Sequence, residues 1–504
     1  MAQRRGATRK FVRDVFFSNL PIPFLKLRTY LYLVVFARAL GPAGYGAWSL
    51  FMVTLGIATT LGTMNFGSSM MRFLSGNRTL KETNQGLSTV LLSVAVCSSV
   101  IGVILCTFSG NFASAIFRQS DKTLVLLVAV VLSFDCVYEE MRGYLRARRL
   151  NRTWAFFSLS RIVPEALLTV AIGWWLRSVT AIVWTYLICG VLAAAIGMLY
   201  LINLRNFRFT KPSRPVLRRY AWFGLALLPG GLAYSLSVSA DRYIVGYFLD
   251  LKQVGIYSVC FTISALGFFL VGPINDVLLP EMSTLYDAGD WDDFHRRFSG
   301  IQRFVFGFSV GATALLVVFP QHVLRILTTR DFYSGSYTLA ILGLQGVFMS
   351  LLMLYIVMLQ VRLRVWSTSL IWVGIGGVVV LIEIILLPRI GLLGAGLAQL
   401  VSSIAGAALV IGLNWQLFRR TFLLSWVFQT GMAFAAVYAT AFFWPSNFAG
   451  FFPSVARLAV ATATFVLGLA VTGYLGLSDV KLLKESLFLT NCKPEAAASY
   501  KAFR

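Results

Sequence analysis

The sequence predicts an all-α integral membrane protein with about 14 transmembrane helices. Three observations predict this fold class. The 504-residue chain is 58% hydrophobic and only 13% charged, whereas soluble domains are about half apolar and a quarter charged. The apolar residues form stretches of about 20, long enough to cross roughly 30 Å of hydrocarbon as a helix. Basic residues gather in the connectors between these stretches.

Each apolar stretch predicts one helix. In chain order, we place the helices at residues 15–38, 46–66, 87–108, 123–142, 154–176, 181–202, 220–247, 255–279, 301–319, 337–359, 366–387, 393–414, 423–444 and 456–476. With the N-terminus in the cytoplasm, roughly 31 basic residues fall in cytoplasmic segments and about 9 outside, as the positive-inside rule requires. The pattern predicts a multi-pass protein of the inner (cytoplasmic) membrane with both termini in the cytoplasm.

The charge and the cysteines exclude several function classes. The net charge of +24 reflects basic cytoplasmic loops, and nucleic-acid binding is not expected. The six cysteines lack metal-ligand spacing, so we expect no metal site, no disulfide and no cofactor. Every external connector is short, so none has room for the catalytic loop of a polytopic glycosyltransferase, polymerase or ligase. We expect a protein that is not an enzyme and has no catalytic residues.

An internal repeat divides the predicted helices. The junction LGPAGYGAWSL aligns without gaps with LDLKQVGIYSV and matches Gly46 to Gly255 and Ser49 to Ser258. Both junctions follow an outward-running helix, which predicts two parallel six-helix lobes and an extra C-terminal helix pair. The predicted division is a cytoplasmic N-terminus (1–14), an N-terminal lobe (15–210), a C-terminal lobe (211–420), helices 13 and 14 (421–476) and a cytoplasmic tail (477–504).

The sequence resembles the polysaccharide transporter family, the Wzx-type flippases of the multidrug/oligosaccharidyl-lipid/polysaccharide (MOP) superfamily. The resemblance lies in ARALGPAGYGAWSL (37–50), in DRYIVGYFLDLKQVGIYSV (241–259) followed by LLPEMSTLYDAGDWDDF (278–294), and in LLPRIGLLGAGLA (386–398). The order and spacing of these strings match across nearly the whole chain.

The resemblance implies a two-lobed flippase working by alternating access. Its expected substrate is a polyprenyl-pyrophosphate-linked oligosaccharide, a repeat unit of O-antigen and hence lipopolysaccharide, capsule or exopolysaccharide, carried from the inner to the outer leaflet. Candidate partners are membrane lipid, a polysaccharide polymerase and a chain-length regulator. Two alternatives stay open: a lipid II flippase for peptidoglycan, and a multidrug or cation antiporter of the same superfamily.

Ionisable side chains inside the predicted helices are the candidate functional residues, because each is costly at mid-bilayer depth unless it meets water or a partner. Lys26 and Arg28 lie near the middle of the first helix, close to Pro21 and Pro23, and are the strongest candidates for binding a diphosphate. The alternative is that the first helix starts later and that both side chains reach the membrane interface.

Arg161 and Arg242 are further candidates for substrate binding. Arg161 lies one turn from Glu165, so the two either neutralise each other or contact substrate or an ion. Arg242 follows Asp241 near the outer end of its helix. Because neighbours on a helix point in different directions, we expect no self-contained pair, and Arg242 either lines the outer cavity or anchors the interface.

Four acids are candidates for coupling transport to a proton or cation. They are Glu165, Asp135, Asp276 and Glu383.

Overall fold

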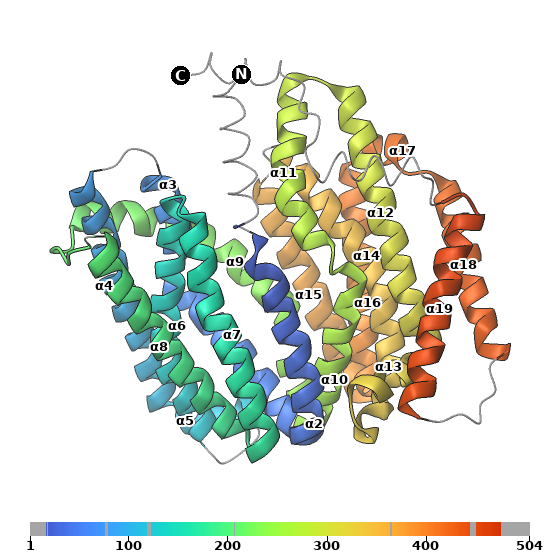
Figure 1. Ribbon diagram of the computed structural model, residues 1–504, viewed down its shortest axis with the longest axis horizontal. Coiled ribbons are helices and arrows are strands. Elements are labelled where there is room, and N and C mark those ends of the chain that lie inside the picture. The colour runs from blue at the N-terminus through green and yellow to red at the C-terminus, as the bar shows by residue number, and fades with distance from the viewer. Residues whose placement is uncertain are drawn as a thin grey trace. The chain divides into compact units, whose positions relative to one another are not determined.

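The computed structural model describes residues 17, 19–75, 79–117, 122–205, 207–362, 365–443 and 450–474. Within these ranges the chain forms helices and no strands, which confirms the all-α prediction (Figure 1). Contacts divide the chain into two compact units. The first contains residues 1–259, 327–334 and 372–395, and the second contains 260–326, 335–371 and 396–504. The predicted lobes at 15–210 and 211–420 stay a prediction.

The first half of the chain forms long helices joined by short connectors. Its elements are α2 (Pro21–Thr63), α3 (Phe66–Phe73), α4 (Leu80–Thr107), α5 (Ser109–Phe112), the π-helix η1 (Ala113–Phe117), α6 (Thr123–Ala147), α7 (Asn151–Leu176), α8 (Val179–Arg205) and α9 (Arg214–Phe248).

The second half continues in the same way. Its elements are α10 (Leu251–Ser264), the 3₁₀-helix η2 (Ala265–Phe268), α11 (Val271–Ala288), α12 (Trp291–Val318), α13 (Pro320–Leu327), the 3₁₀-helix η3 (Arg330–Gly335), α14 (Ser336–Val361), α15 (Val365–Ile390), α16 (Leu392–Leu413), α17 (Trp415–Thr421), α18 (Leu424–Phe443) and α19 (Phe451–Val471).

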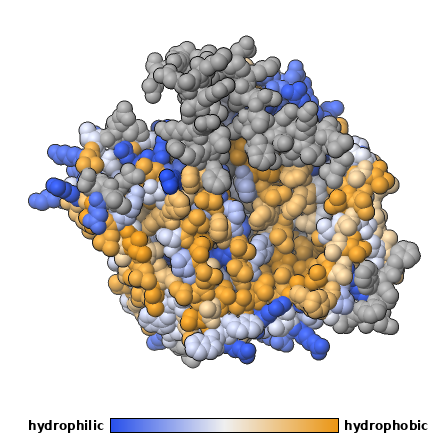
Figure 2. Space-filling view, viewed as in Figure 1, coloured by the Kyte–Doolittle hydropathy of each residue, from blue (hydrophilic) through white to orange (hydrophobic). Residues whose placement is uncertain are grey.

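Eleven helices among the described residues are long and apolar enough to span a membrane, or up to 12 if the bent pair α17 and α18 is one span. Over its described residues, each of the 14 predicted segments is mostly helical, but the count of 14 spans stays a prediction. The first two predicted helices lie in the single 43-residue α2, and α6 carries several acids and bases that make it too polar for the same test. In Figure 2, hydrophobic side chains cover most of the visible face, and hydrophilic ones gather near its upper and lower margins.

Helix α2 breaks in the middle. Gly41 has φ 68° and ψ −177°, which is not helical, and Pro42 follows it. A glycine accepts this positive φ without steric cost, and proline cannot donate the backbone hydrogen bond that would continue the helix. The break separates the two predicted helices, so they meet at an angle without an intervening loop.

The two repeat junctions contact each other where α2 meets α10. A Cβ atom on Gly46 would lie 2.1 Å from the Leu251 carbonyl oxygen, and one on Gly255 would lie 1.8 Å from the Pro42 carbonyl oxygen. Ser49 Oγ also donates to Ser258 Oγ over 2.8 Å. Residues equated by the sequence alignment therefore lie together, and only glycine permits so close an approach of the two backbones.

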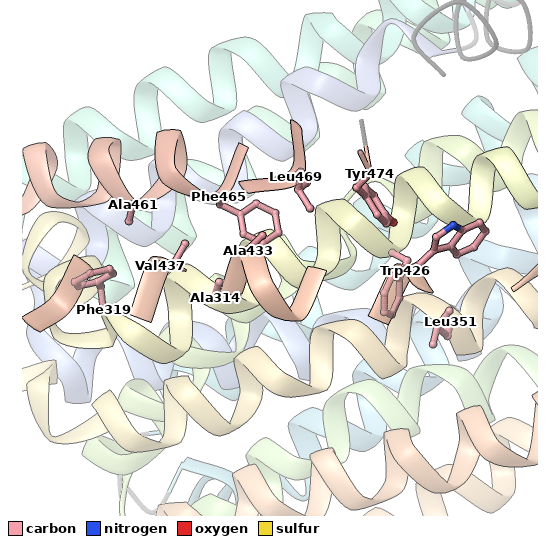
Figure 3. Packing of buried hydrophobic residues seen from close by; sticks show 11 residues of the cluster. Ala314, Phe319, Leu351, Trp426, Ala433, Val437, Ala461, Phe465, Leu469 and Tyr474 are labelled. Carbon is pink, nitrogen blue, oxygen red and sulfur yellow. The ribbon is translucent and has the colours of Figure 1, made fainter. Parts of the chain in front are cut away.

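The second unit has an apolar core built by α12, α18 and α19. Figure 3 shows Phe465 of α19 lying over Ala433 of α18, with Ala314 of α12 beneath. A Cβ on Gly468 would lie 3.0 Å from the Ala433 Cα atom, so small residues let α18 and α19 approach closely. This packing joins the extra C-terminal helix pair to the rest of its unit.

Candidate functional site

A buried ion network lies in the first unit, where α2 packs against α7. Arg28 of α2 donates from Nη1 to Glu165 Oε1 of α7 over 2.5 Å, and Tyr32 donates to the same oxygen over 3.3 Å. The hydroxyl of Thr169, one turn beyond Glu165, donates to the Tyr32 hydroxyl over 2.7 Å. The first helix therefore brings its cation inward to a carboxylate 137 residues away in the chain.

The network continues from α7 to α6 and α8. Arg161 donates from Nε to Glu165 Oε2 over 3.0 Å and from Nη2 to Asp135 Oδ1 of α6 over 2.5 Å. Tyr186 of α8 donates to Asp135 Oδ2 over 3.0 Å. Four helices thus contribute to one chain of charge-assisted hydrogen bonds, the stronger kind of protein hydrogen bond.

The network is balanced in charge, with two guanidinium groups and two carboxylates. The Glu165 side chain is fully buried, whereas that of Arg28 is 16% exposed and forms the accessible end. The Arg161 guanidinium carbon also lies 4.5 Å from the Tyr138 ring centre and 5.1 Å from that of Tyr186, within cation–π range. Burial of such groups is tolerated only when each is paired.

Arg161 and Glu165 form an internal pair in this structure, and Arg28 and Asp135 enlarge it. Lys26 is exposed. It lies two residues from Arg28, so the two side chains point to different sides of α2.

Residues of α9, α10 and α15 form a second charged cluster. Asp241 Oδ1 accepts from the Arg242 backbone N–H over 2.8 Å and from Arg242 Nη1 over 3.2 Å. Tyr257 of α10 donates to Asp241 Oδ2 over 2.7 Å. Glu383 of α15 is fully buried, and Asp241 and Arg242 act on it electrostatically.

We expected no self-contained pair at Asp241 and Arg242, and the structure shows that the two pair with each other as part of the larger cluster. Their side chains leave the helix in different directions, but the long Arg242 side chain folds back to reach both Asp241 and the Val238 carbonyl oxygen, at 3.0 Å. Arg242 is also buried, so it is neither an interfacial anchor nor an exposed cation.

One candidate falls outside this description. Asp276 lies in α11, and its side chain is outside the described residues. Within the described ranges, no group of three or more His, Cys, Asp or Glu side chains is arranged to hold a metal ion.

Sequence reasoning missed the tyrosines that complete both clusters. Tyr32, Tyr186 and Tyr257 all donate hydrogen bonds to buried carboxylates. Their signal was present, because a tyrosine inside an apolar helix needs a partner for its hydroxyl when it is buried.

An apolar groove opens on another side of the first unit. Its volume is about 300 Å³, and residues of α4, α6 and α8 line it, among them Ser99, Phe134, Val137 and Ala194. No charged residue lines it. None of the residues of the two charged clusters lines it, and its apolar lining suits hydrocarbon.

Comparison with known proteins identifies the family. Residues 35–337, more than half of the chain, match the family described as polysaccharide biosynthesis protein. An uncharacterised membrane protein of Methanocaldococcus jannaschii is 22% identical over 417 residues, which cover 78% of this chain and 94% of the relative. The probable flippase AglR of Haloferax volcanii is 21% identical over 399 residues, covering 76% and 80% of the two chains.

Solved structures share the fold. The lipid II flippase MurJ in an inward closed conformation superposes with a TM-score of 0.73 and 13% identity, covering 91% of this chain and 98% of MurJ. An inward-facing multidrug resistance transporter of the MATE family superposes with a TM-score of 0.62 and 14% identity, covering 80% and 98%. The chain therefore belongs to the polysaccharide biosynthesis protein family and has the fold of the MOP superfamily of membrane transporters.

Proposed function

We propose that the protein is a flippase for a polyprenyl-pyrophosphate-linked oligosaccharide. It would carry a repeat unit of O-antigen, capsule or exopolysaccharide from the cytoplasmic to the outer leaflet by alternating access. Its family membership supports this, as do AglR and a second Haloferax volcanii relative named as a probable low-salt glycan biosynthesis flippase, 20% identical over 350 residues.

The observation that carries the proposal is the state of Arg28. Its guanidinium lies about two turns inside an apolar helix and remains partly exposed. Its Nε is buried and has no hydrogen-bond acceptor among the described residues. The exposed part of the guanidinium is available to a diphosphate, whose oxygens bind guanidinium groups bidentately.

The remaining basic residues take different roles in this proposal. Lys26 supplies a second cation from another side of α2. Arg161 holds Glu165 and Asp135, so it positions the network around Arg28 rather than reaching the substrate. Arg242 belongs to the second cluster through Asp241.

Lipid II remains a second candidate substrate, because MurJ superposes over nearly its whole length. It is also a lipid-linked diphosphate and would use the same cations. A multidrug antiporter is less well supported, because its cationic substrates would be repelled by Lys26 and Arg28.

Reconstitution tests the proposed function. The purified protein is placed in vesicles that contain a fluorescent polyprenyl-pyrophosphate oligosaccharide, and exposure of its sugar to a membrane-impermeant glycosidase is followed with time. We expect protein-dependent equilibration between leaflets. Parallel vesicles with lipid II or a cationic dye identify the substrate class, and flipping of either in place of the oligosaccharide would overturn the proposal.

A deletion experiment tests the same function in cells. Without the gene, the lipid-linked oligosaccharide should accumulate in the cytoplasmic leaflet. Normal surface display after deletion, in a strain without a redundant carrier, would reject the function. The same cells allow the predicted cytoplasmic termini and a partnership with a polymerase or chain-length regulator to be examined by reporter fusions and co-purification.

The variant K26Q/R28Q tests the proposed cations. Transport should be abolished while membrane insertion is kept, and K81Q at an exposed position of α4 serves as the control. Because R28Q leaves Glu165 short of one partner, the charge-balanced variant R28Q/E165Q is measured beside it. Transport at the normal rate in either Arg28 variant would show that other cations bind the diphosphate.

A further inference from the structure

Glu383 differs from every other buried acid in the two charged clusters. Its side chain in α15 is fully buried, yet neither carboxyl oxygen has a hydrogen-bond partner among the described residues. Glu165 is equally buried but accepts hydrogen bonds from Arg28, Arg161 and Tyr32. The two glutamates can be compared directly, because both side chains are fully buried but only the Glu165 carboxylate has hydrogen-bond donors.

The charge count of the second cluster points the same way. The groups that act on Glu383 are Asp241 and Arg242 of α9 and Tyr257 of α10. Counted over these described groups alone, two ionised carboxyl groups and the Arg242 guanidinium leave one negative charge uncompensated. One proton makes this cluster neutral, whereas the network around Arg161 is neutral without one.

The hydrogen bonds show which acid holds that proton. Asp241 accepts from the Arg242 backbone, the Arg242 guanidinium and the Tyr257 hydroxyl, all of which favour its ionised form. Glu383 receives no such donor. A carboxyl group in this position avoids the cost of a buried unpaired charge by binding a proton.

The same arrangement is unsuited to a metal cation. Hard cations require several oxygen ligands at once. The Asp241 oxygens already accept hydrogen bonds from Arg242 and Tyr257, and Arg242 adds a positive charge beside Glu383. The cluster has the composition of a proton site.

We propose that Glu383 is a proton-binding site, protonated in this conformation, whose proton exchanges with water during the transport cycle. When the proton leaves for water, the Glu383 carboxylate competes with Asp241 for the Arg242 guanidinium. The pairing between α9 and α15 thus differs between the two protonation states. The link to transport rests on the proposed function, whereas the proton site itself does not.

Infrared spectroscopy tests the proton site directly. Wild-type protein in lipid at neutral pH should show the carbonyl stretch of a protonated, non-hydrogen-bonded carboxylic acid, and E383Q should lack it. E165Q, the matched control, should leave this band in place. A wild-type spectrum without the band, or a band that persists in E383Q, would overturn the proposal.

Stability provides a second measurement that needs no substrate. Glutamine resembles protonated glutamate in shape and charge, so E383Q should melt at the wild-type temperature. E165Q should melt lower, because it removes a charge that two arginines share. A large drop for E383Q would mean that Glu383 is ionised in the folded protein. Loss of the infrared band on addition of sodium ions, without a pH change, would show that Glu383 binds a metal cation and would overturn its assignment as a proton site.

The coupling is tested in the flipping assay with a pH difference across the vesicle membrane. Wild-type transport should respond to the direction of the pH difference, and E383Q should lose that response. If E383Q responds like the wild type, the coupling is wrong. If no oligosaccharide is flipped by the wild type, the proposed function fails, while the infrared band still decides whether Glu383 binds a proton.

Discussion

Arg161 bonds both carboxylates of the buried network, so its replacement tests whether charge balance stabilises the fold. R161Q removes one guanidinium that bonds Asp135 at 2.5 Å and Glu165 at 3.0 Å. Glu165 keeps Arg28, but Asp135 loses its ion pair and the network acquires one net negative charge. Removing one partner of a buried ion pair costs about 3–5 kcal/mol, because the other charge stays buried and uncompensated.

The double variant D135N/R161Q separates charge balance from simple loss of contacts. It leaves Arg28 and Glu165 as a neutral pair, so most of the lost stability should return although more side chains have changed. The free energy of unfolding is measured in mixed micelles with increasing SDS, followed by circular dichroism. A single variant that costs less than about 1 kcal/mol, or a double variant no more stable than the single, would refute the reasoning.

Two further predictions concern packing and pH. G255A should prevent stable folding, because its Cβ would overlap the Pro42 carbonyl oxygen, whereas G56A, whose Cβ would meet open space, should be neutral. Size-exclusion chromatography of the fluorescently tagged variants compares their folding. A well-folded G255A would show that the α2 and α10 backbones lie farther apart than in this structure. His322, in the short helix α13 outside the spanning segments, lies 2.6 Å from Arg457, and burial and this arginine lower its pKa. The unfolded chain therefore binds a proton more readily, and stability should fall as pH drops below about 6.5 and level off below the folded pKa. The melting temperature of H322Q should depend less on pH in this range, and an equal dependence would contradict the assignment.

The helical fold could be predicted because hydrocarbon thickness fixes the length of each apolar run. The ends of the helices could not be predicted from apolar runs, since a helix can continue beyond the hydrocarbon as a polar segment. Helix α4 begins at Leu80, seven residues before its predicted start at 87, and the signal was Thr79 followed by Glu82. These two residues form a capping box in which each side chain bonds the other's backbone N–H.

The candidate site could be predicted only where partners are close in sequence. The spacing of Arg161 and Glu165 indicated their pair because residues four apart share a helix face. Nothing in the sequence indicated that Arg28 would reach Glu165 or that Asp135 would join them, because those contacts depend on how α2, α6 and α7 pack. Asp241 and Arg242 show the opposite limit, since a long flexible side chain overrides the direction set by its backbone.

The crossing of α2 and α10 has the reciprocal geometry of a twofold homodimer interface, although both helices belong to one chain. Gly46 meets the residue equivalent to the one that Gly255 meets, and Ser49 bonds its own counterpart 209 residues away. In a true homodimer, both halves would have to carry identical side chains. Because both halves belong to one chain, their side chains can differ while the two backbones keep the reciprocal arrangement.

Side chains close to the crossing differ between the two halves. Trp48 and Tyr257 occupy equivalent positions in the aligned junctions. Trp48 contacts the Tyr32 ring beside the balanced network, with ring centres 5.9 Å apart, whereas Tyr257 bonds Asp241 beside Glu383. The reciprocal crossing therefore carries two different electrostatic environments on one scaffold, one neutral by itself and one for which we propose a bound proton.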